Sequence, residues 1–181
     1  MFKPNTYCYG DGTRAGINPS VICLSTNGYV KKSGAAVMGR GCAKAAADID
    51  PRLPLQLGNA IKECGNNVQI IGTLLGAYEV VSFPVKPTIS VCAEGKTNVV
   101  SHMRDRMTVG KVVPGWACLA DMTIIKRSAQ QLVSLTEKAG WMHVVLPRPG
   151  IGAGCLNWDD VKPVLEKILD DRFYVITFGR K

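Results

Sequence analysis

The chain has 181 residues, 46% hydrophobic and 20% charged, which matches one folded domain over residues 1–181 and excludes an intrinsically disordered protein. It has no apolar run of about 20 residues and no apolar stretch near its start, so we expect a cytoplasmic protein without a membrane partner. The formal net charge of +8 favours an anionic ligand, and because the basic residues are scattered without interleaved aromatic residues, a basic nucleic-acid-binding protein is the second interpretation.

The first half of the chain predicts three strands and one helix. The apolar run at 21–25 ends in a group of turn formers and predicts a buried strand. A glycine-containing loop that feeds an alanine-rich helix is predicted at 35–47. Two β-rich runs at 67–75 and 78–83 predict strands joined by a tight turn, and we expect Pro84 to end the second.

The next part of the chain begins with polar, glycine-bearing sequence at 87–114, which predicts an excursion on the surface in the form of a hairpin or lid. The pattern at 124–139 predicts an amphipathic helix that ends at Gly140. A short buried strand at 143–146 and a glycine loop at 147–154 are expected to follow.

The last predicted helix covers 158–169, with Asn157 or Asp159 as its cap and Pro163 in or near its first turn. A strand at 173–178 closes the chain. Because strands alternate with helices, we predict an α/β fold with a mostly parallel sheet covered on both faces. Ligands of such sheets bind beyond the carboxyl ends of the strands.

The cysteines do not indicate a metal site. There are seven, with no CxxC pair, and the chain has only two histidines, so neither a disulfide framework nor a zinc site is expected. We expect no metal and no cofactor. Cys23, inside the run at 21–25, is interpreted as a small core residue.

Two glycine-rich loops follow predicted strands. Such a loop lets the backbone approach a phosphate while N–H groups supply the counter-charge. Gly39-Arg40-Gly41 is weak evidence on its own, because a glycine pair more often marks a turn. The loop at 150–154 is stronger, since its alternate glycines lie between a buried strand and a capped helix.

Three segments taken together resemble macro domains. They are VMGRGCA at 37–43, SFPVK at 82–86 and LPRPGIGAGCLNW at 146–158. The segments are most similar to the antitoxin macro domains that remove ADP-ribose from DNA and to macro-domain-like proteins of bacteriophages. The resemblance covers about 21–86 and 121–169. It implies a three-layer α/β/α sandwich, and the host cytoplasm as the location if the protein is of phage origin.

The resemblance also implies a ligand, which is ADP-ribose or an ADP-ribosyl group, and a role for each matching residue. Lys86 would be the catalytic lysine, with Asn27 hydrogen-bonded to the distal ribose beside it. Asp11 would accept a hydrogen bond from the adenine amino group. The first loop, Val37, Met38, Gly39, Arg40 and Gly41, would line the distal ribose and the diphosphate. The second loop would wrap the diphosphate from the other side through Gly150, Ile151, Gly152, Ala153, Gly154 and Cys155.

Each role has a simpler alternative, because Asn27 before Gly28 is also a common turn residue and Lys86 could be an ordinary lysine at a strand end. Relatives that act on protein carboxylates carry an aspartate where Gly154 stands, so the resemblance favours DNA over protein as the modified partner. Three hypotheses follow: a hydrolase of ADP-ribosylated nucleic acid, a non-catalytic reader of ADP-ribose or a related metabolite, and a basic nucleic-acid-binding protein.

Overall fold

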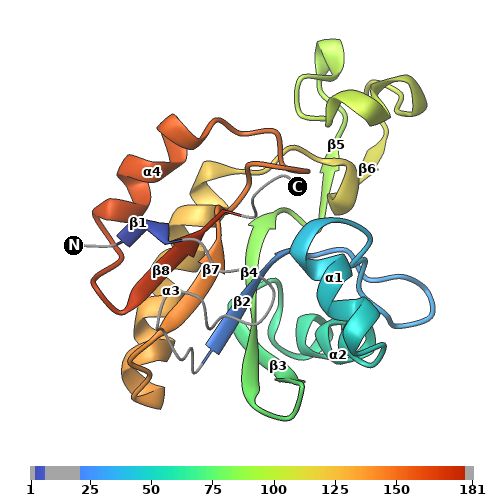
Figure 1. Ribbon diagram of the computed structural model, residues 1–181. Helices are drawn as coiled ribbons and strands as arrows, with labels where there is room; N and C mark the ends of the chain where they lie inside the picture. The colour runs from blue at the N-terminus through green and yellow to red at the C-terminus, as the bar shows by residue number, and fades with distance from the viewer. Residues whose placement is uncertain (1–2, 7–20, 178–181) are drawn as a thin grey trace.

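The computed structural model describes residues 3–6 and 21–177 (Figure 1). Its main sheet has six strands in the order β1-β8-β7-β2-β4-β3. All neighbouring strands are parallel except β3 and β4, which are antiparallel, so the predicted mostly parallel sheet is confirmed. The strands are β1 (Lys3–Thr6), β2 (Val21–Asn27), β3 (Gln69–Leu74), β4 (Tyr78–Lys86), β7 (Val144–Pro147) and β8 (Phe173–Ile176).

Helices cover both faces of this sheet (Figure 1). On one side lie α1 (Gly41–Ile49) and α2 (Leu53–Cys64), and on the other lie α3 (Met122–Ala139) and α4 (Trp158–Glu166). The three-layer α/β/α arrangement is therefore the one predicted. No helix in the described part of the chain is long and apolar enough to cross a membrane.

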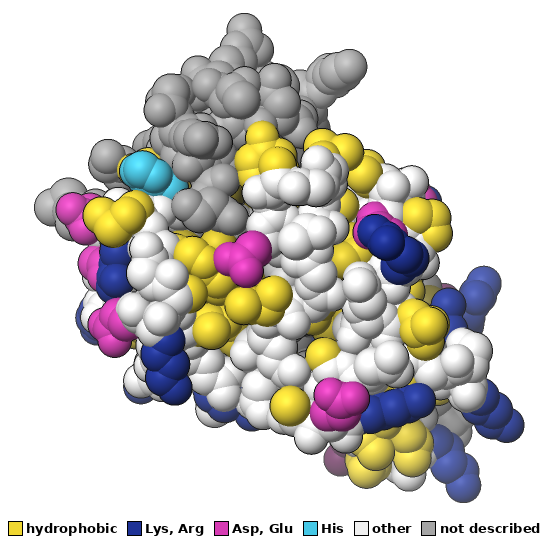
Figure 2. Space-filling model, turned by 90° about the horizontal axis from the view of Figure 1, so that it is seen from below, with side chains coloured by type: hydrophobic (Ala, Val, Ile, Leu, Met, Phe, Trp, Pro, Cys, Tyr) yellow, Lys and Arg dark blue, Asp and Glu magenta, His cyan; other side chains and the backbone are white. Residues whose placement is uncertain are grey.

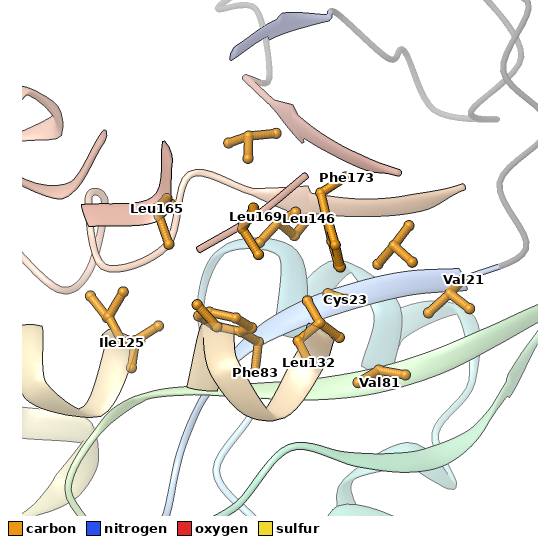
Figure 3. Packing of buried hydrophobic residues seen from close by; sticks show 14 of the residues in the cluster. Val21, Cys23, Val81, Phe83, Ile125, Leu132, Leu146, Leu165, Leu169 and Phe173 are labelled. Atoms are coloured by element: carbon orange, nitrogen blue, oxygen red, sulfur yellow. The ribbon is translucent and has the colours of Figure 1, made fainter. Parts of the chain in front are cut away.

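The core forms on both faces because successive side chains of a strand point to opposite sides of a sheet. Val81 and Phe83 of β4 pack with α3 and α4, whereas Val80 belongs to the cluster beneath α1 and α2. Figure 3 shows Phe83 directed toward Leu132 of α3. Cys23 lies in the same cluster and is 0% exposed, which confirms its interpretation as a core residue.

Strand β4 continues to Lys86, so the prediction that Pro84 ends this strand was wrong. Pro84 pairs with Thr26 of β2, whereas the pairing with β3 stops at Ser82. Among the described strands, β2 is thus the one neighbour of this end of β4, and proline is tolerated at such edge positions. The extra residues place Lys86 at the carboxyl edge of the sheet.

Helix α2 was not predicted, although its sequence permits a helix. Pro54 lies in the first turn, where the missing N–H is not needed. Gly58 faces the backbone of Gly34, and a Cβ there would overlap the Gly34 carbonyl. The Ala36 N–H donates to the Pro54 carbonyl at 2.7 Å, so α2 supports the base of the first glycine loop.

The last helix is shorter than predicted. It is capped by Asn157, whose side chain accepts the Asp159 N–H at 3.2 Å, and it ends at Glu166. Pro163 lies beyond the first turn, inside the helix, where it has no N–H to donate to a carbonyl of the preceding turn. Strand β8 likewise ends at Ile176, and residues 178–181 lie outside the described part.

The segment 87–119, which we term the hairpin module, contains the hairpin expected within 87–114. Strand β5 (Ile89–Val91) pairs antiparallel with β6 (Val112–Pro114). Three short 3-10 helices, η1 (Glu94–Lys96), η2 (Ser101–Arg106) and η3 (Gly115–Ala117), complete the module. In Figure 1 it projects beyond the upper end of β4. Its own small core consists of Cys92, Val99, Val100, Met103, Val113, Ala117 and Cys118.

Ser128 of α3 holds the end of β4. Its side chain is 0% exposed and its hydroxyl donates to the Pro84 carbonyl at 2.7 Å. Ser128→Ala should leave this carbonyl without a donor and lower the free energy of unfolding by about 1–3 kcal/mol, measured by chemical denaturation. Ser134→Ala, on the exposed side of the same helix, is the matched control and should change it by less than about 0.5 kcal/mol. Equal effects of the two substitutions would contradict the assigned role.

Candidate functional site

A cleft of about 470 Å³ lies at the carboxyl ends of β2, β4, β7 and β8. Its volume is within the range of about 300–1,000 Å³ that is usual for small-molecule sites. Its position is the one expected for ligands of parallel sheets. Asn27 and Lys86 line the cleft together with residues of both glycine loops and of the hairpin module. The first loop contributes Val37, Met38, Gly39, Arg40 and Gly41, the second contributes Gly150, Ile151, Gly152, Ala153 and Gly154, and the hairpin module contributes His102, Met103 and Trp116.

Asn27 and Lys86 lie side by side because they are partners in the β2–β4 register. The Asn27 side-chain amide donates to the Val37 carbonyl at 2.9 Å and accepts the Tyr29 N–H at 3.1 Å. Asn27 therefore fixes the first loop to the end of β2, as a turn residue would. One amide hydrogen and one oxygen lone pair remain for a ligand.

The first glycine loop leads directly into α1. Arg40 is extended and Gly41 has a φ of 59°, a left-handed conformation that favours glycine. Since α1 begins at Gly41, the N–H groups of its first turn have no partner inside the helix. Gly41, Cys42 and Ala43 all line the cleft, so this positive helix end is accessible to an anion.

Two glycines of the second loop are required by packing. Gly150 has a φ of 78°, and a Cβ there would lie 2.8 Å from Ile125 Cδ1. At Gly154 a Cβ would lie 2.7 Å from Ala120 Cβ and would also overlap the Gly150 carbonyl. The fold itself therefore explains the absence of side chains at these two positions.

Gly39 and Gly152 differ from the packing glycines. A Cβ at Gly152 would meet nothing within 4 Å, and one at Gly39 would meet a single Val37 methyl group at 4.0 Å. Neither residue has a positive φ, and both are exposed at the cleft. Neither packing nor backbone conformation thus requires glycine here. Glycine at these positions leaves the backbone open to close approach from the cleft.

The packing role of Gly154 is testable. Gly154→Ala should lower the free energy of unfolding by about 1–3 kcal/mol, because the added methyl group overlaps two neighbours. Gly152→Ala is the matched control and should leave stability within about 0.5 kcal/mol of the parent. Thermal and chemical denaturation of both variants measure the difference, and a stable Gly154→Ala protein would refute the packing argument.

Lys86 is the charged residue with the most unusual environment in the cleft. Its side chain is 5% exposed, and its ammonium donates to the Ala153 carbonyl at 2.7 Å and to the Trp116 carbonyl at 3.2 Å. Burial lowers the pKa of Lys86 to about 8, against the opposing effects of the Cys155 and Cys118 thiols. A lysine at a strand end that is surrounded by water would have none of these features. Lys86 is therefore not an ordinary solvated lysine.

Several polar atoms at the cleft have no hydrogen-bond partner. The hydroxyls of Ser25 and Thr26 and the Arg148 Nε are buried and unpaired, and all three residues line the cleft. The Arg148 guanidinium is held over the Trp158 ring, 4.8 Å from its centre. Buried polar groups are normally paired, so their concentration here indicates a polar ligand.

The cleft includes residues that sequence reasoning missed. His102, Met103 and Trp116 come from the hairpin module, and no motif pointed to them. Arg148 was inside a quoted motif without a role. Cys155, by contrast, is not among the residues that line the cleft. It lines a second hollow next to the cleft. Asp11 lies outside the described residues, so its predicted contact with adenine stays a prediction.

Within residues 21–177, no group of three or more histidine, cysteine, aspartate or glutamate side chains is placed to hold a metal ion. The cysteines described there are free thiols, and burial raises the pKa of Cys23 and Cys42. Beside its apolar side chains, the cleft offers polar groups that are mainly backbone amides, hydroxyls and cations. Such groups suit an anionic, hydrogen-bonding ligand.

Comparison with solved structures decides the fold. The macrodomain of Mycobacterium tuberculosis DarG matches 98% of this chain over 99% of its own length, with a TM-score of 0.64 and 18% identity. The macrodomain of Thermus aquaticus DarG matches 99% of this chain over 99% of its own length, with a TM-score of 0.63 and 16% identity. The chain has a macrodomain fold. No family model and no curated protein matches this chain by sequence.

A further similar structure is Thermosipho africanus DarTG in complex with ADP-ribose. It matches 87% of this chain over 38% of its own length, with a TM-score of 0.59 and 16% identity. The chain thus shares its fold with the macrodomains of DarG proteins, and its two glycine loops lie within that fold. Both loops line one cleft.

Proposed function

We propose that this macrodomain binds ADP-ribose or an ADP-ribosyl group in its cleft. The observation that carries the proposal is the pair of open glycines, Gly39 and Gly152, which lie in two different loops and line the same cleft. A diphosphate between them would receive backbone N–H groups without obstruction from side chains. The similarity in fold to DarTG in complex with ADP-ribose supports this choice of ligand.

The unpaired polar atoms fit the remainder of such a ligand. Ser25 and Thr26 lie at the end of β2, next to Asn27, where a ribose with free hydroxyls would find partners. Arg148 supplies a cation at the second loop, and its guanidinium could pair with a phosphate oxygen. Because these groups are protein donors and acceptors, no metal is needed for binding.

We further propose that Lys86 makes the protein a hydrolase of ADP-ribosylated nucleic acid. With a pKa of about 8, roughly a tenth of the lysine is a free amine at neutral pH. The amine lone pair forms a bond to the anomeric carbon of the distal ribose as the bond from that carbon to the base breaks. The base keeps the electron pair and takes up a proton, the new secondary ammonium releases one, and water then displaces Lys86 and frees ADP-ribose.

The preference for nucleic acid rests on the second loop. No side chain fits at Gly154, because a Cβ there would overlap the Gly150 carbonyl. The aspartate that the resemblance associates with release from protein carboxylates is therefore absent, and the backbone leaves no room for a side chain in its place. This favours a substrate whose chemistry does not depend on that carboxylate.

One observation favours a non-catalytic reader as the second candidate. Both carbonyls that Lys86 contacts, those of Ala153 and Trp116, stabilise the ammonium and hold it between the second loop and the hairpin module. If this contact persists with ligand bound, Lys86 orders the cleft and does not attack. The two candidates share the binding site and differ only in turnover.

Incubation of the protein with ADP-ribosylated single-stranded DNA and with ADP-ribosylated protein, followed by measurement of released ADP-ribose, separates these functions. We expect release from DNA and little from protein. If the protein binds ADP-ribose but releases it from neither substrate, it is a non-catalytic reader of ADP-ribose. Faster release from protein than from DNA would contradict the argument from Gly154.

A further inference from the structure

A second hollow adjoins the cleft on the side of α1. It shares part of the two glycine loops with the cleft, and it also reaches Lys44 on α1 and Cys155. The described residues that line it are Gly39, Arg40, Gly41, Lys44, His102, Gly152, Ala153 and Cys155. Ala153 accepts the hydrogen bond from Lys86, so the hollow begins next to the amine that we place at the reacting carbon.

The charged side chains among the residues of this hollow, Arg40 and Lys44, are both basic. Arg40 and Lys44 come from the first loop and α1, and His102 comes from the hairpin module, so two separate parts of the fold contribute. None of the described residues that line the hollow is acidic. Lys44 forms an ion pair with Asp48 one turn along α1, at 2.6 Å, but both side chains are more than half exposed, and such a pair exchanges readily with a competing anion.

His102 lies close enough to neighbouring cations for their charge to change its pKa. Burial lowers the pKa of His102, and the positive charges of Arg40 and Lys86 lower it further. His102 is therefore a neutral imidazole at neutral pH, able to donate one hydrogen bond. Arg40 and Lys44 remain as the permanent charges, and they face open solvent rather than a closed pocket.

Figure 2 shows the molecule from below, away from the hairpin module, and Lys and Arg side chains there lie mainly near the rim, several beside acidic ones. The hollow beside the cleft combines two cations, Arg40 and Lys44, with the neutral imidazole of His102, and it shares Ala153 with the contact made by Lys86.

We propose that the hollow lined by Arg40, Lys44 and His102 binds a backbone phosphate of the nucleic-acid strand that carries the ADP-ribosyl group. This inference rests on the proposed function, since it needs the ADP-ribosyl group in the adjoining cleft. A flexible lysine and an exposed arginine are the usual partners of backbone phosphates, which position a strand without reading its sequence. The substrate is accordingly a polynucleotide, with little dependence on base sequence at this contact.

The test measures how affinity depends on salt. The probe is a short single-stranded oligonucleotide whose ADP-ribosyl group is attached through a carbon–carbon bond, so that it cannot be hydrolysed, and free ADP-ribose is the reference ligand. Each phosphate contact on a single strand adds about 0.7 to the slope of log affinity against log salt concentration. The wild type should show a steeper slope for the oligonucleotide than for ADP-ribose.

Lys44→Gln should remove about 0.7 from the oligonucleotide slope and weaken binding about fivefold at about 0.1 M salt. Its affinity for ADP-ribose should stay unchanged, because Lys44 lines the hollow and not the cleft. Lys162→Gln is the matched control, since Lys162 also pairs with an acid one helical turn away, Glu166 on α4, and lines neither site. This control should leave both slopes as they are.

The outcomes separate the subsite from the function itself. Equal slopes for oligonucleotide and ADP-ribose, or a Lys44→Gln variant that behaves as Lys162→Gln does, would overturn the phosphate subsite. The same holds if an ADP-ribosylated acidic peptide binds as tightly as the oligonucleotide and loses as much affinity with Lys44→Gln. Failure of the wild type to bind ADP-ribose would instead overturn the proposed function.

Discussion

Gly152→Glu should abolish ADP-ribose binding, with a loss of affinity of about 100-fold or more. The substitution introduces a carboxylate and its stem at the point where we place the diphosphate, and like charges at close range cost several kcal/mol. The fold should tolerate the change, because a Cβ at Gly152 meets nothing within 4 Å and the residue is exposed. Titration calorimetry measures the loss.

The matched control for this substitution is Ala77→Glu, which adds the same charge at an exposed turn between β3 and β4. It should bind ADP-ribose as the parent does. Circular dichroism and the unfolding temperature of both variants establish that they are folded. Unchanged affinity in a folded Gly152→Glu protein would remove the diphosphate from the second loop.

Lys86→Arg should reduce the release of ADP-ribose from DNA by about 10³-fold or more, since it removes the proposed nucleophile. Arginine can still donate to the carbonyls of Ala153 and Trp116, but it stays protonated and cannot attack. Binding of ADP-ribose should fall far less than turnover. Lys86→Ala is a less clean test, because it also leaves two carbonyls without their donor.

The pH dependence gives an independent test of Lys86. Because the free amine is the reactive form in the proposed mechanism, the rate should rise with pH up to about 8 and level off above it. Lys138→Arg, an exposed lysine of α3, should alter neither rate nor profile. A flat profile from pH 6 to 9 in the wild type, or full activity of Lys86→Arg, would assign Lys86 to positioning alone.

The parts of the site that could be predicted from sequence are those with a local signature. The strand at 21–25, the helix before Gly140 and the two glycine loops all depend on neighbours in the chain, and each is found close to its predicted place. Cys23 in the core is of the same kind. Periodicity and turn chemistry are sufficient for such features.

The parts that could not be predicted depend on tertiary contacts. Pro84 signals the end of a strand locally, yet β4 passes through it because β2 still pairs there. His102 and Trp116 reach the cleft only because the hairpin module folds over its own small core. The difference between Gly152 and Gly154 is likewise invisible in sequence, since it depends on whether Ala120 lies beside the residue.

The most direct test of the account is a calorimetric titration of the protein with ADP-ribose in the presence of a metal chelator, with unmodified single-stranded DNA as the comparison. The account predicts saturable binding of one ADP-ribose per chain that the chelator does not weaken, and weaker binding of the DNA that falls steeply with salt. Absence of ADP-ribose binding, together with tight binding of unmodified DNA, would contradict it.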